Sequence, residues 1–390
     1  DNNELTSCIH GEYYVDRNEP SCECYSCFTG DNCEIMLDDC IISAGGGSAH
    51  MFVEYWNIVA DDVEQVTIPI NYRAAYQSNL FGPFSETQST GIGGELNQLI
   101  RSVHKKFNNV NTTGKYLIMG VGASQLTTAF YTAWGKIKGT QIIAYARNPY
   151  YYLLQTRCRA ATSMYCTWNV SNELGNEVDK IVEMVTIPNN PDGKEYEPWY
   201  DTDAIGHDLV YYWPHFYEAE DIYPRDVAYA MFSFTKMTGH AASRFGWAFV
   251  EDYNLAMTMR TYMSESVLAL PIDTHIRAKQ IFGYLASDNG ANYFDYVRER
   301  MRSRWATFLS IFEGQSNYIQ RGEPLKQYGW MECVNKTNSE CRAKFNEYQI
   351  NPRSGADQGC INCFRFNLAE YEGNFPRIME RFKNMVDAER

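Results

Sequence analysis

Six of the twelve cysteines in this chain fall within the first 40 residues, and this clustering constrains the fold more than any other feature. The segment SCIHGEYYVDRNEPSCECYSCFTGDNCEIMLDDC has few aliphatic residues, so it needs cross-links in place of a hydrophobic core. Six cysteines allow fifteen pairings, and the sequence alone does not choose among them. A zinc site is the less favoured alternative, since it needs four ligands at knuckle spacing.

The cysteine content also indicates an oxidising compartment. Three sequons, at Asn111, Asn169 and Asn335, are candidate glycosylation sites on the secretory route. The sequence starts at Asp1 with no methionine and no apolar leader, as a mature chain does after signal removal. We therefore expect a protein of the secretory pathway that is vacuolar or extracellular.

The bulk composition favours a globular protein of two or more domains. The chain has 390 residues, of which 45% are apolar and 21% are charged. No apolar run approaches the roughly 18 to 20 residues that span a bilayer, so no membrane span is expected. The formal charge of −14 argues against nucleic acid as a partner.

Beyond a predicted hinge at residues 45–48, short apolar runs indicate an α/β protein. The run at 115–119 predicts a strand, followed by a glycine turn and a helix that begins near Ser124. Further strands are predicted within 140–146, 180–187, 207–213, 227–234 and 245–251. The segments between these runs are long enough to form crossover connections between parallel strands. This indicates a mainly parallel sheet covered on both faces. From about residue 253 the pattern is helical and charged.

The stretch MFSFTKMTGHAASRFGWAF carries the most informative chemistry. Lys236 follows a predicted buried strand, where desolvation lowers the pKa of an amine and favours a Schiff base. The hydroxyls of Ser233 and Thr235 and the guanidinium of Arg244 are groups that bind a phosphate. The alternative interpretation is a surface lysine that ends a strand.

Two further motifs would complete such a site. The turn GVGASQ at 120–125 leads into a helix, so its free N–H groups form a candidate anion site. It is not a dinucleotide fingerprint, because Gln125 occupies the place of the third glycine. Asn190 and Asp208 lie near predicted strand ends, where Asp208 could pair with a protonated pyridine nitrogen. The structural alternatives are a proline–asparagine turn and a helix cap.

In this order along one chain, these elements resemble the alliinase and tryptophan aminotransferase family of plants and algae. The matching stretches are EYW, GVGASQL, IVEMVTIPNNPDG, DLVYYWPHF and TKMTGHAASRFGWAF. The resemblance implies an α/β fold of type I pyridoxal phosphate enzymes, similar to aspartate aminotransferase. It has a large, mainly parallel sheet domain, a smaller C-terminal α/β domain and an EGF-like module. The implied bounds are 1–42 for the EGF-like module, 43–64 for an arm, 65–270 for the large domain and 271–390 for the small domain.

The resemblance also implies a role for each matching residue, with pyridoxal 5'-phosphate as the cofactor. Lys236 would form the Schiff base and shuttle the proton at the substrate Cα, Asp208 would pair with the pyridine nitrogen, and Arg365 would bind the substrate α-carboxylate. The family usually has T-x-S-K where this chain has S-F-T-K, and both keep two hydroxyls. The remaining implied cofactor contacts are Asn190 and Tyr211 to the ring oxygen, Tyr151 stacked on the ring, and Gly122, Ala123, Ser124, Ser233, Thr235 and Arg244 at the phosphate, with Tyr76 from a neighbouring subunit.

For the cysteines, the resemblance implies the disulfides Cys8–Cys22, Cys24–Cys33, Cys27–Cys40 and Cys333–Cys341. Cys158 and Cys166 have the same spacing as the last pair, and either a disulfide or two separate thiols fits it. The C-x-x-C pair Cys360 and Cys363 favours a structural disulfide or free thiols over a redox role. The histidines form no H-x-x-H pair, so no metal site is predicted.

The EGF-like head favours a C–S lyase of the alliinase type. Such an enzyme would eliminate the sulfur substituent of S-substituted cysteines or their sulfoxides. The substituent would leave as a sulfenic acid or thiol, and the remainder of the substrate would become pyruvate and ammonia. An aminotransferase acting on an aromatic or other amino acid is the enzymatic alternative, because both reactions need the same cofactor site. The third alternative is an inactive secreted glycoprotein whose head binds a protein or glycan partner, although the retained Lys236, Asp208 and Arg244 argue against it. The resemblance implies a homodimer.

Overall fold

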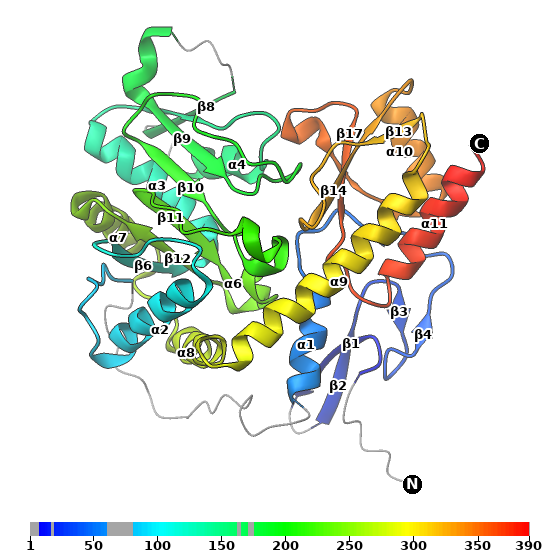
Figure 1. Ribbon diagram of the computed structural model, residues 1–390, viewed down its shortest axis with the longest axis horizontal. Coiled ribbons are helices and arrows are strands. Elements are labelled where there is room, and N and C mark those ends of the chain that lie inside the picture. Colours follow the sequence, from blue (N-terminus) through cyan, green and yellow to red (C-terminus); the bar gives the residue numbers. More distant parts are fainter. Residues whose placement is uncertain (1–7, 17–18, 61–80, 162–164, 171–174, 390) are drawn as a thin grey trace.

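The computed structural model describes residues 8–16, 19–60, 81–161, 165–170 and 175–389 (Figure 1). The larger of its sheets has seven strands in the order β6-β12-β11-β10-β9-β7-β8. The strands from β11 to β8 run parallel to one another, whereas β12 is antiparallel to both of its neighbours. The sheet is therefore mainly parallel, as predicted. Its strands are β6 (Tyr116–Val121), β7 (Ile142–Tyr145), β8 (Cys166–Asn169), β9 (Ile181–Thr186), β10 (Ile205–Asp208), β11 (Tyr229–Ser233) and β12 (Phe245–Val250).

Helices cover both faces of this sheet, which explains why its strands are apolar throughout. Phe130 of α3 (Gly122–Lys138) has its ring centroid 4.3 Å from that of Tyr229 on one face. On the other face, Trp247 lies against Phe282 of α8 (Ile272–Ala286) and His104 of α2 (Gly91–Phe107). Further helices of this part are α4 (Leu153–Ala160), the short α6 (Phe234–Met237) and α7 (Tyr253–Val267).

Two local predictions need correction. The strand predicted within 207–213 ends at Asp208, because Leu209 and Tyr212 form a turn closed by the Tyr212 N–H and the Leu209 carbonyl at 2.9 Å. The helix predicted to begin near Ser124 begins at Gly122. Strand β8 was not predicted, since its four residues lack a continuous apolar run.

A second sheet of four antiparallel strands lies toward the C-terminus, in the order β13-β14-β17-β16. The long helix α9 (Asn289–Phe312) leads to it from the large sheet, and α11 (Phe375–Asp387) packs beside α9 (Figure 1). The predicted domain bounds stay a prediction. The strands are β13 (Tyr318–Gln320), β14 (Tyr328–Cys333), β16 (Arg353–Ser354) and β17 (Cys363–Asn367), and nearby helices are α1 (Met51–Ala60) and α10 (Asn338–Glu347).

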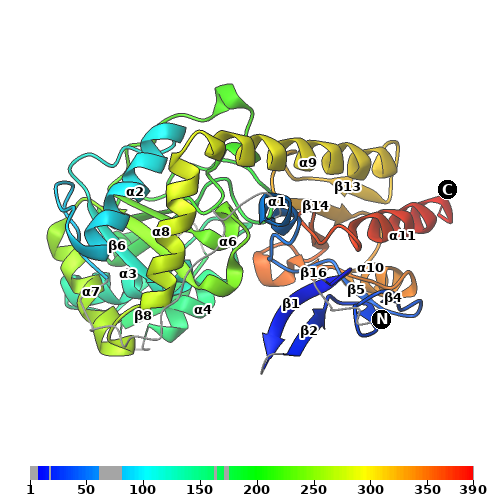
Figure 2. The same cartoon turned by 90° about the horizontal axis from the view of Figure 1, so that it is seen from below.

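The cysteine-rich head packs against this C-terminal part (Figure 2). Arg377 and Arg381 of α11 donate hydrogen bonds to the carbonyls of Leu37 and Cys40 at 3.0 and 2.9 Å. The structure pairs the head's cysteines as Cys8–Cys22, Cys24–Cys33 and Cys27–Cys40, the pairing that the resemblance implied. The strands are β1 (Gly11–Asp16), β2 (Glu19–Cys24), β3 (Phe28–Thr29), β4 (Ile35–Met36) and β5 (Ile42–Ser43), of which β5 pairs with β15 (Ile350–Asn351).

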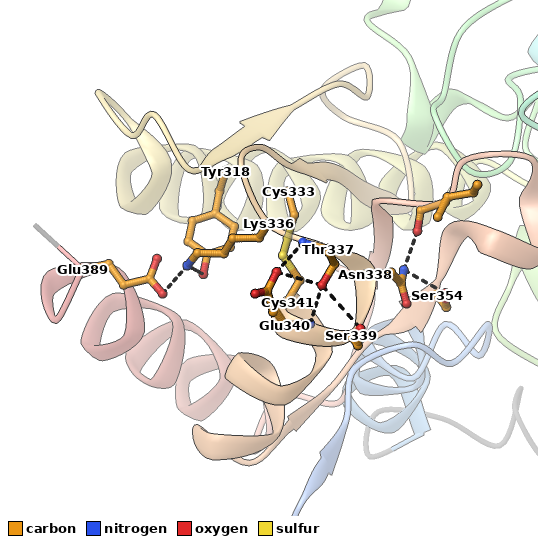
Figure 3. The surroundings of a disulfide bond; sticks show 11 residues. Tyr318, Cys333, Lys336, Thr337, Asn338, Ser339, Glu340, Cys341, Ser354 and Glu389 are labelled. Atoms are coloured by element: carbon orange, nitrogen blue, oxygen red, sulfur yellow. Dashed lines mark hydrogen bonds and ion pairs between the residues drawn. A yellow bond between two sulfur atoms is a disulfide. The ribbon is translucent and has the colours of Figure 1, made fainter.

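Disulfides also join Cys333 to Cys341, Cys158 to Cys166 and Cys360 to Cys363. The first of these links the end of β14 to α10, whose N-terminus is closed by a reciprocal cap between Thr337 and Glu340 (Figure 3). Cross-linking and capping together fix the turn that carries Asn335. Across the described ranges, we find no helix that is both long and apolar enough to cross a bilayer.

Candidate active site

The predicted chemical residues gather at one edge of the large sheet. Asp208 is the last residue of β10, Lys236 follows β11 within α6, and Asn190 lies in the loop after β9. Because β9, β10 and β11 are parallel neighbours, their carboxyl ends meet at this edge. The order of the strands therefore brings together residues that are 46 positions apart or fewer in sequence.

Asp208 is a buried carboxyl group, with 3% of its surface exposed. Burial raises the pKa of Asp208 to about 7, against the opposing effects of the Val210 N–H and the positive charge of Lys236. The Val210 N–H donates to its Oδ1 at 3.3 Å. A buried carboxylate of this kind is suited to a cationic ligand that restores its charged form.

Lys236 reaches from the large sheet toward the C-terminal sheet. Its Nζ donates hydrogen bonds to the carbonyl of Gly47 and, at 3.2 Å, to the hydroxyl of Tyr328. Burial lowers the pKa of Lys236, and the nearby charge of Arg365 adds to this, while Tyr328 and Asp208 oppose it. A lowered pKa increases the share of neutral amine, which is the nucleophilic form. The Ser233 hydroxyl begins this turn by accepting the Thr235 N–H at 3.3 Å.

A cradle for an anion lies between the ends of β6 and β11 and the start of β12. Gly122 has a φ of +70°, and a Cβ there would lie 2.6 Å from Nη2 of Arg244. The guanidinium therefore occupies the space that only glycine leaves open. Arg244 has no carboxylate partner among the described residues, and its Nη1 donates to the Ala241 carbonyl at 3.1 Å. Ala123 and Ser124 lie in the first turn of α3, where backbone N–H groups have no partner within the helix.

Gln125, which breaks the dinucleotide pattern, has a role of its own in this turn. Its Oε1 accepts the Val121 N–H at 2.7 Å and so fixes the backbone just before the cradle.

A hydrogen-bonded network joins the two sheets across the site. Asn190 is fully buried and donates through Nδ2 to the Tyr211 hydroxyl at 2.9 Å, while its Oδ1 accepts from Arg365 Nη1 at 2.9 Å. The Tyr211 hydroxyl lies 3.0 Å from that of Tyr328. This chain of contacts places Arg365 of β17 beside residues of the large sheet.

Arg365 has unused donor capacity. Only 2% of its surface is exposed, and its Nη2 donates to the Gly45 carbonyl at 2.9 Å. Its Nε is buried and has no partner within the described part of the chain. A guanidinium with a free donor near a half-buried lysine is suited to a carboxylate.

The family follows from comparison with known proteins. Residues 42–386 match the family model described as Allinase. The chain belongs to the alliinase family.

Relatives in the alliinase family include proteins named for two activities. "Tryptophan aminotransferase-related protein 3" of Arabidopsis thaliana is 28% identical over 97% of this chain and 87% of its own length. "Alliin lyase 2" of Allium sativum is 26% identical over 98% of this chain and 85% of its own length. Among solved structures, an aspartate aminotransferase of Thermus thermophilus shares the fold, with a TM-score of 0.64 at 14% identity over 88% of this chain and 96% of that one.

The alliinase family uses pyridoxal 5'-phosphate, and the residues of this site fit that group. The phosphate fits the cradle that Gly122 leaves for Arg244, and the pyridine nitrogen fits the buried carboxyl of Asp208. The lysine between them, Lys236, is the amine that the cofactor's aldehyde requires. The chain is therefore a member of a family of pyridoxal phosphate enzymes with fold type I.

The remaining residues predicted for the alliinase-family site lie in several places. Tyr151 is half-buried, and burial raises its pKa. The charge of Asp208 also raises the pKa of Tyr151, whereas the charge of Arg365 lowers it. Its stacking on the cofactor stays a prediction. Tyr76 lies outside the described residues, as does Ser171 of the second sequon. Asn335 is exposed and Asn111 is half-buried, its Oδ1 accepting the Thr113 N–H at 3.0 Å.

Sequence reasoning missed two parts of this alliinase-family site. Tyr328 contacts Lys236, Tyr211 and Arg365, yet nothing in the sequence distinguishes it among 29 tyrosines. The segment at 45–48, predicted to be a hinge, instead forms a wall of the site, because the carbonyls of Gly45 and Gly47 accept bonds from Arg365 and Lys236. The run of glycines was the available signal of a close backbone approach, since a Cβ at Gly45 would lie 2.4 Å from the backbone N of Arg353.

Proposed function

We propose that this protein is a pyridoxal phosphate-dependent C–S lyase acting on S-substituted cysteines, including their sulfoxides. The observation that carries the proposal is the match to proteins named alliin lyase over 98% of the chain. Proteins named tryptophan aminotransferase-related protein 2 match over 90% of the chain. The products would be a sulfenic acid or thiol together with aminoacrylate, which water converts to pyruvate and ammonia.

In this proposal, the cofactor is held by residues of the large-sheet part and by one residue of a second subunit. It supplies an electron sink for the charge that develops at the substrate Cα. Asp208 would keep the ring nitrogen protonated, and Asn190 and Tyr211 would bind the ring oxygen. Tyr151 would stack on the ring. The phosphate is bound by Gly122, Ala123, Ser124, Ser233, Thr235 and Arg244, with Tyr76 of the neighbouring subunit.

The protein's own residues then position and protonate the substrate. Arg365 binds the α-carboxylate through its unused donors, which fixes the Cα–H bond relative to Lys236. The neutral amine of Lys236 takes the Cα proton, and the resulting ammonium can return it to the departing sulfur group. The lowered pKa of Lys236 favours the first of these steps.

The same proposal includes an oxidising compartment and a dimer. Six disulfides among the described residues are what a secreted or vacuolar protein would contain. We propose Asn335, which is exposed, as the first glycosylation site to examine, with Asn111 and Asn169 after it. A protein or glycan partner of the head is part of the proposal but has no identified contact surface.

Transamination is the second candidate, and a specific observation supports it. Tryptophan aminotransferase-related protein 3 is 28% identical to this chain over 97% of its length, a match that also takes in most of the head. Transamination would use Lys236, Asp208 and Arg365 in the same positions but would return the proton to the cofactor rather than expel sulfur. The amino acid would be aromatic or of another type.

The test is pyruvate release from an S-alkyl-cysteine sulfoxide in the absence of any 2-oxo acid. We expect equal amounts of pyruvate and ammonia over many turnovers, and none from Lys236→Ala. Keto-acid formation that requires an added 2-oxo acid would instead assign transamination. A protein that binds no cofactor and forms neither product would support the inactive glycoprotein.

A further inference from the structure

We propose that Tyr328 is a positioning residue that orients the amine of Lys236 for proton transfer. This inference rests on the proposed function, in which Lys236 moves the Cα proton. Tyr328 is 4% exposed, and its hydroxyl lies 3.2 Å from Lys236 Nζ and 3.0 Å from the Tyr211 hydroxyl. It is the residue of the C-terminal sheet that touches the reacting nitrogen.

The fold holds Tyr328 in place together with the proposed carboxylate clamp. Tyr328 begins β14 and pairs with Asn367 of β17, while Arg365 lies two residues earlier on β17. Residues at this diagonal offset lie on the same face of a sheet and are neighbours. The Arg365 Cζ accordingly lies 4.1 Å from the centroid of the Tyr328 ring. The paired strands β14 and β17 therefore supply both Tyr328, which contacts Lys236, and Arg365, the proposed carboxylate-binding residue.

We assign one direction to the hydrogen bonds around Tyr211. A phenol has one hydrogen to donate and two lone pairs to accept. The Tyr211 oxygen accepts from Asn190 Nδ2, and if it also accepts from Tyr328, its own hydrogen is left for another acceptor in the site. In that arrangement Tyr328 donates to Tyr211 and accepts from Lys236.

This direction determines where the lone pair of Lys236 points. A neutral amine has two hydrogens and one lone pair. One hydrogen goes to the Gly47 carbonyl, which can only accept, and the other goes to Tyr328. The lone pair is left facing the remaining direction, ready to take a proton. After it does so, the same two bonds persist and the third hydrogen is the one that Lys236 can give up.

The electrostatics agree with this geometry. Burial would raise the pKa of Tyr328, but the positive charges of Lys236 and Arg365 outweigh burial, so its pKa is lowered. Reciprocally, the Tyr328 hydroxyl raises the pKa of Lys236 against the effect of burial. Removing that hydroxyl should therefore lower the pKa of Lys236 further.

The experiment compares Tyr328→Phe with Tyr318→Phe in two assays. Tyr318 is a matched control, because it is a buried tyrosine of the same sheet whose hydroxyl contacts Lys336, at 3.4 Å. In cofactor-free protein, the rate at which cyanate carbamylates Lys236 is measured against pH by peptide mass spectrometry. We expect the midpoint for Tyr328→Phe to move to lower pH by about half a unit or more, and the control to match the wild type.

In the loaded enzyme, exchange of the substrate Cα hydrogen with deuterated water reports the step that Lys236 performs. We expect this exchange and kcat to fall about tenfold or more in Tyr328→Phe, with KM little changed. An unshifted midpoint, or a shifted midpoint with normal exchange, would overturn the inference. If the wild type exchanged the substrate Cα hydrogen but released no pyruvate, the proposed elimination would be refuted. The exchange rates of the wild type and Tyr328→Phe would still test the role of Tyr328.

Discussion

Arg365 donates a hydrogen bond of 2.9 Å to Asn190 Oδ1, and so connects a strand of the C-terminal sheet to a loop of the large sheet. The two residues are 175 positions apart in sequence. Any change at Arg365 is therefore expected to act on substrate binding and, through Asn190, on the cofactor side of the site.

The first prediction concerns substrate binding by Arg365. Arg365→Lys keeps the charge but loses the planar pair of donors, so kcat/KM should fall about 10- to 100-fold, mainly through KM. Steady-state kinetics with an S-alkyl-cysteine sulfoxide measure this. Arg353→Lys is the control, because Arg353 lies directly opposite Arg365 on the neighbouring strand. An equal rise in KM for both variants would refute a specific role for Arg365.

The second prediction tests the phosphate cradle. Gly122→Ala introduces a Cβ 2.6 Å from Arg244 Nη2, so the guanidinium must move and the affinity for cofactor should fall at least about tenfold. Gly114→Ala is the control, because Gly114 has a φ of +72°, close to the +70° of Gly122, but open space around it. Equilibrium dialysis of the cofactor measures the effect, and similar loss in both variants would attribute it to backbone strain alone.

The third prediction follows from the raised pKa of Asp208, about 7 in the folded protein and 3.8 when unperturbed. The folded state keeps this proton to higher pH than the unfolded chain does, so cofactor-free protein should lose stability as pH rises from about 4 to 7. Asp208→Asn removes that loss, which is at most roughly 4 kcal/mol. The free energy of unfolding of Asp208→Asn, relative to that of the wild type, should therefore increase as pH rises from about 4 to 7.

Urea unfolding of cofactor-free protein at pH 5 and pH 8 measures this dependence. Asp201→Asn is the control, since Asp201 is exposed. The interpretation would be contradicted if Asp208→Asn and the wild type lost stability in parallel between the two pH values.

The fourth prediction concerns the disulfide between Cys333 and Cys341, whose partners are 8 residues apart in sequence (Figure 3). Replacing both cysteines by serine frees this loop in the unfolded chain and should lower the free energy of unfolding by about 2–3 kcal/mol. Chemical denaturation measures the change, with Ser339→Ala, which leaves the disulfide intact, as the control. No loss of stability would mean that the cross-link closes a turn already fixed by the cap at Thr337.

The sequence predicted those parts of the fold and site that depend on local pattern. Short apolar runs predicted the buried strands β6, β7, β9, β11 and β12, because burial on both faces removes the alternation of polar residues. Asp208, Asn190 and Lys236 were singled out because they lie near the ends of predicted strands, where open α/β sheets bind ligands. Their convergence at one sheet edge then follows from the parallel strand order.

Contacts between distant segments could not be predicted in this way. Tyr328 is 92 residues from Lys236, and only the packing of the C-terminal sheet against the large sheet brings them together. The carbonyls of Gly45 and Gly47 act through the backbone, so the run of glycines indicates a close approach of the chain but not which side chains its carbonyls bind. The early end of β10 was missed because the turn after Asp208 is itself apolar and buried.

The most direct test of this account is to locate the covalent attachment of the cofactor. The protein would be loaded with pyridoxal 5'-phosphate, reduced with borohydride, digested and analysed by peptide mass spectrometry. The account predicts a single pyridoxyl phosphate label on Lys236, absent from Lys236→Ala. A label on another lysine, or none on protein that has bound the cofactor, would contradict it.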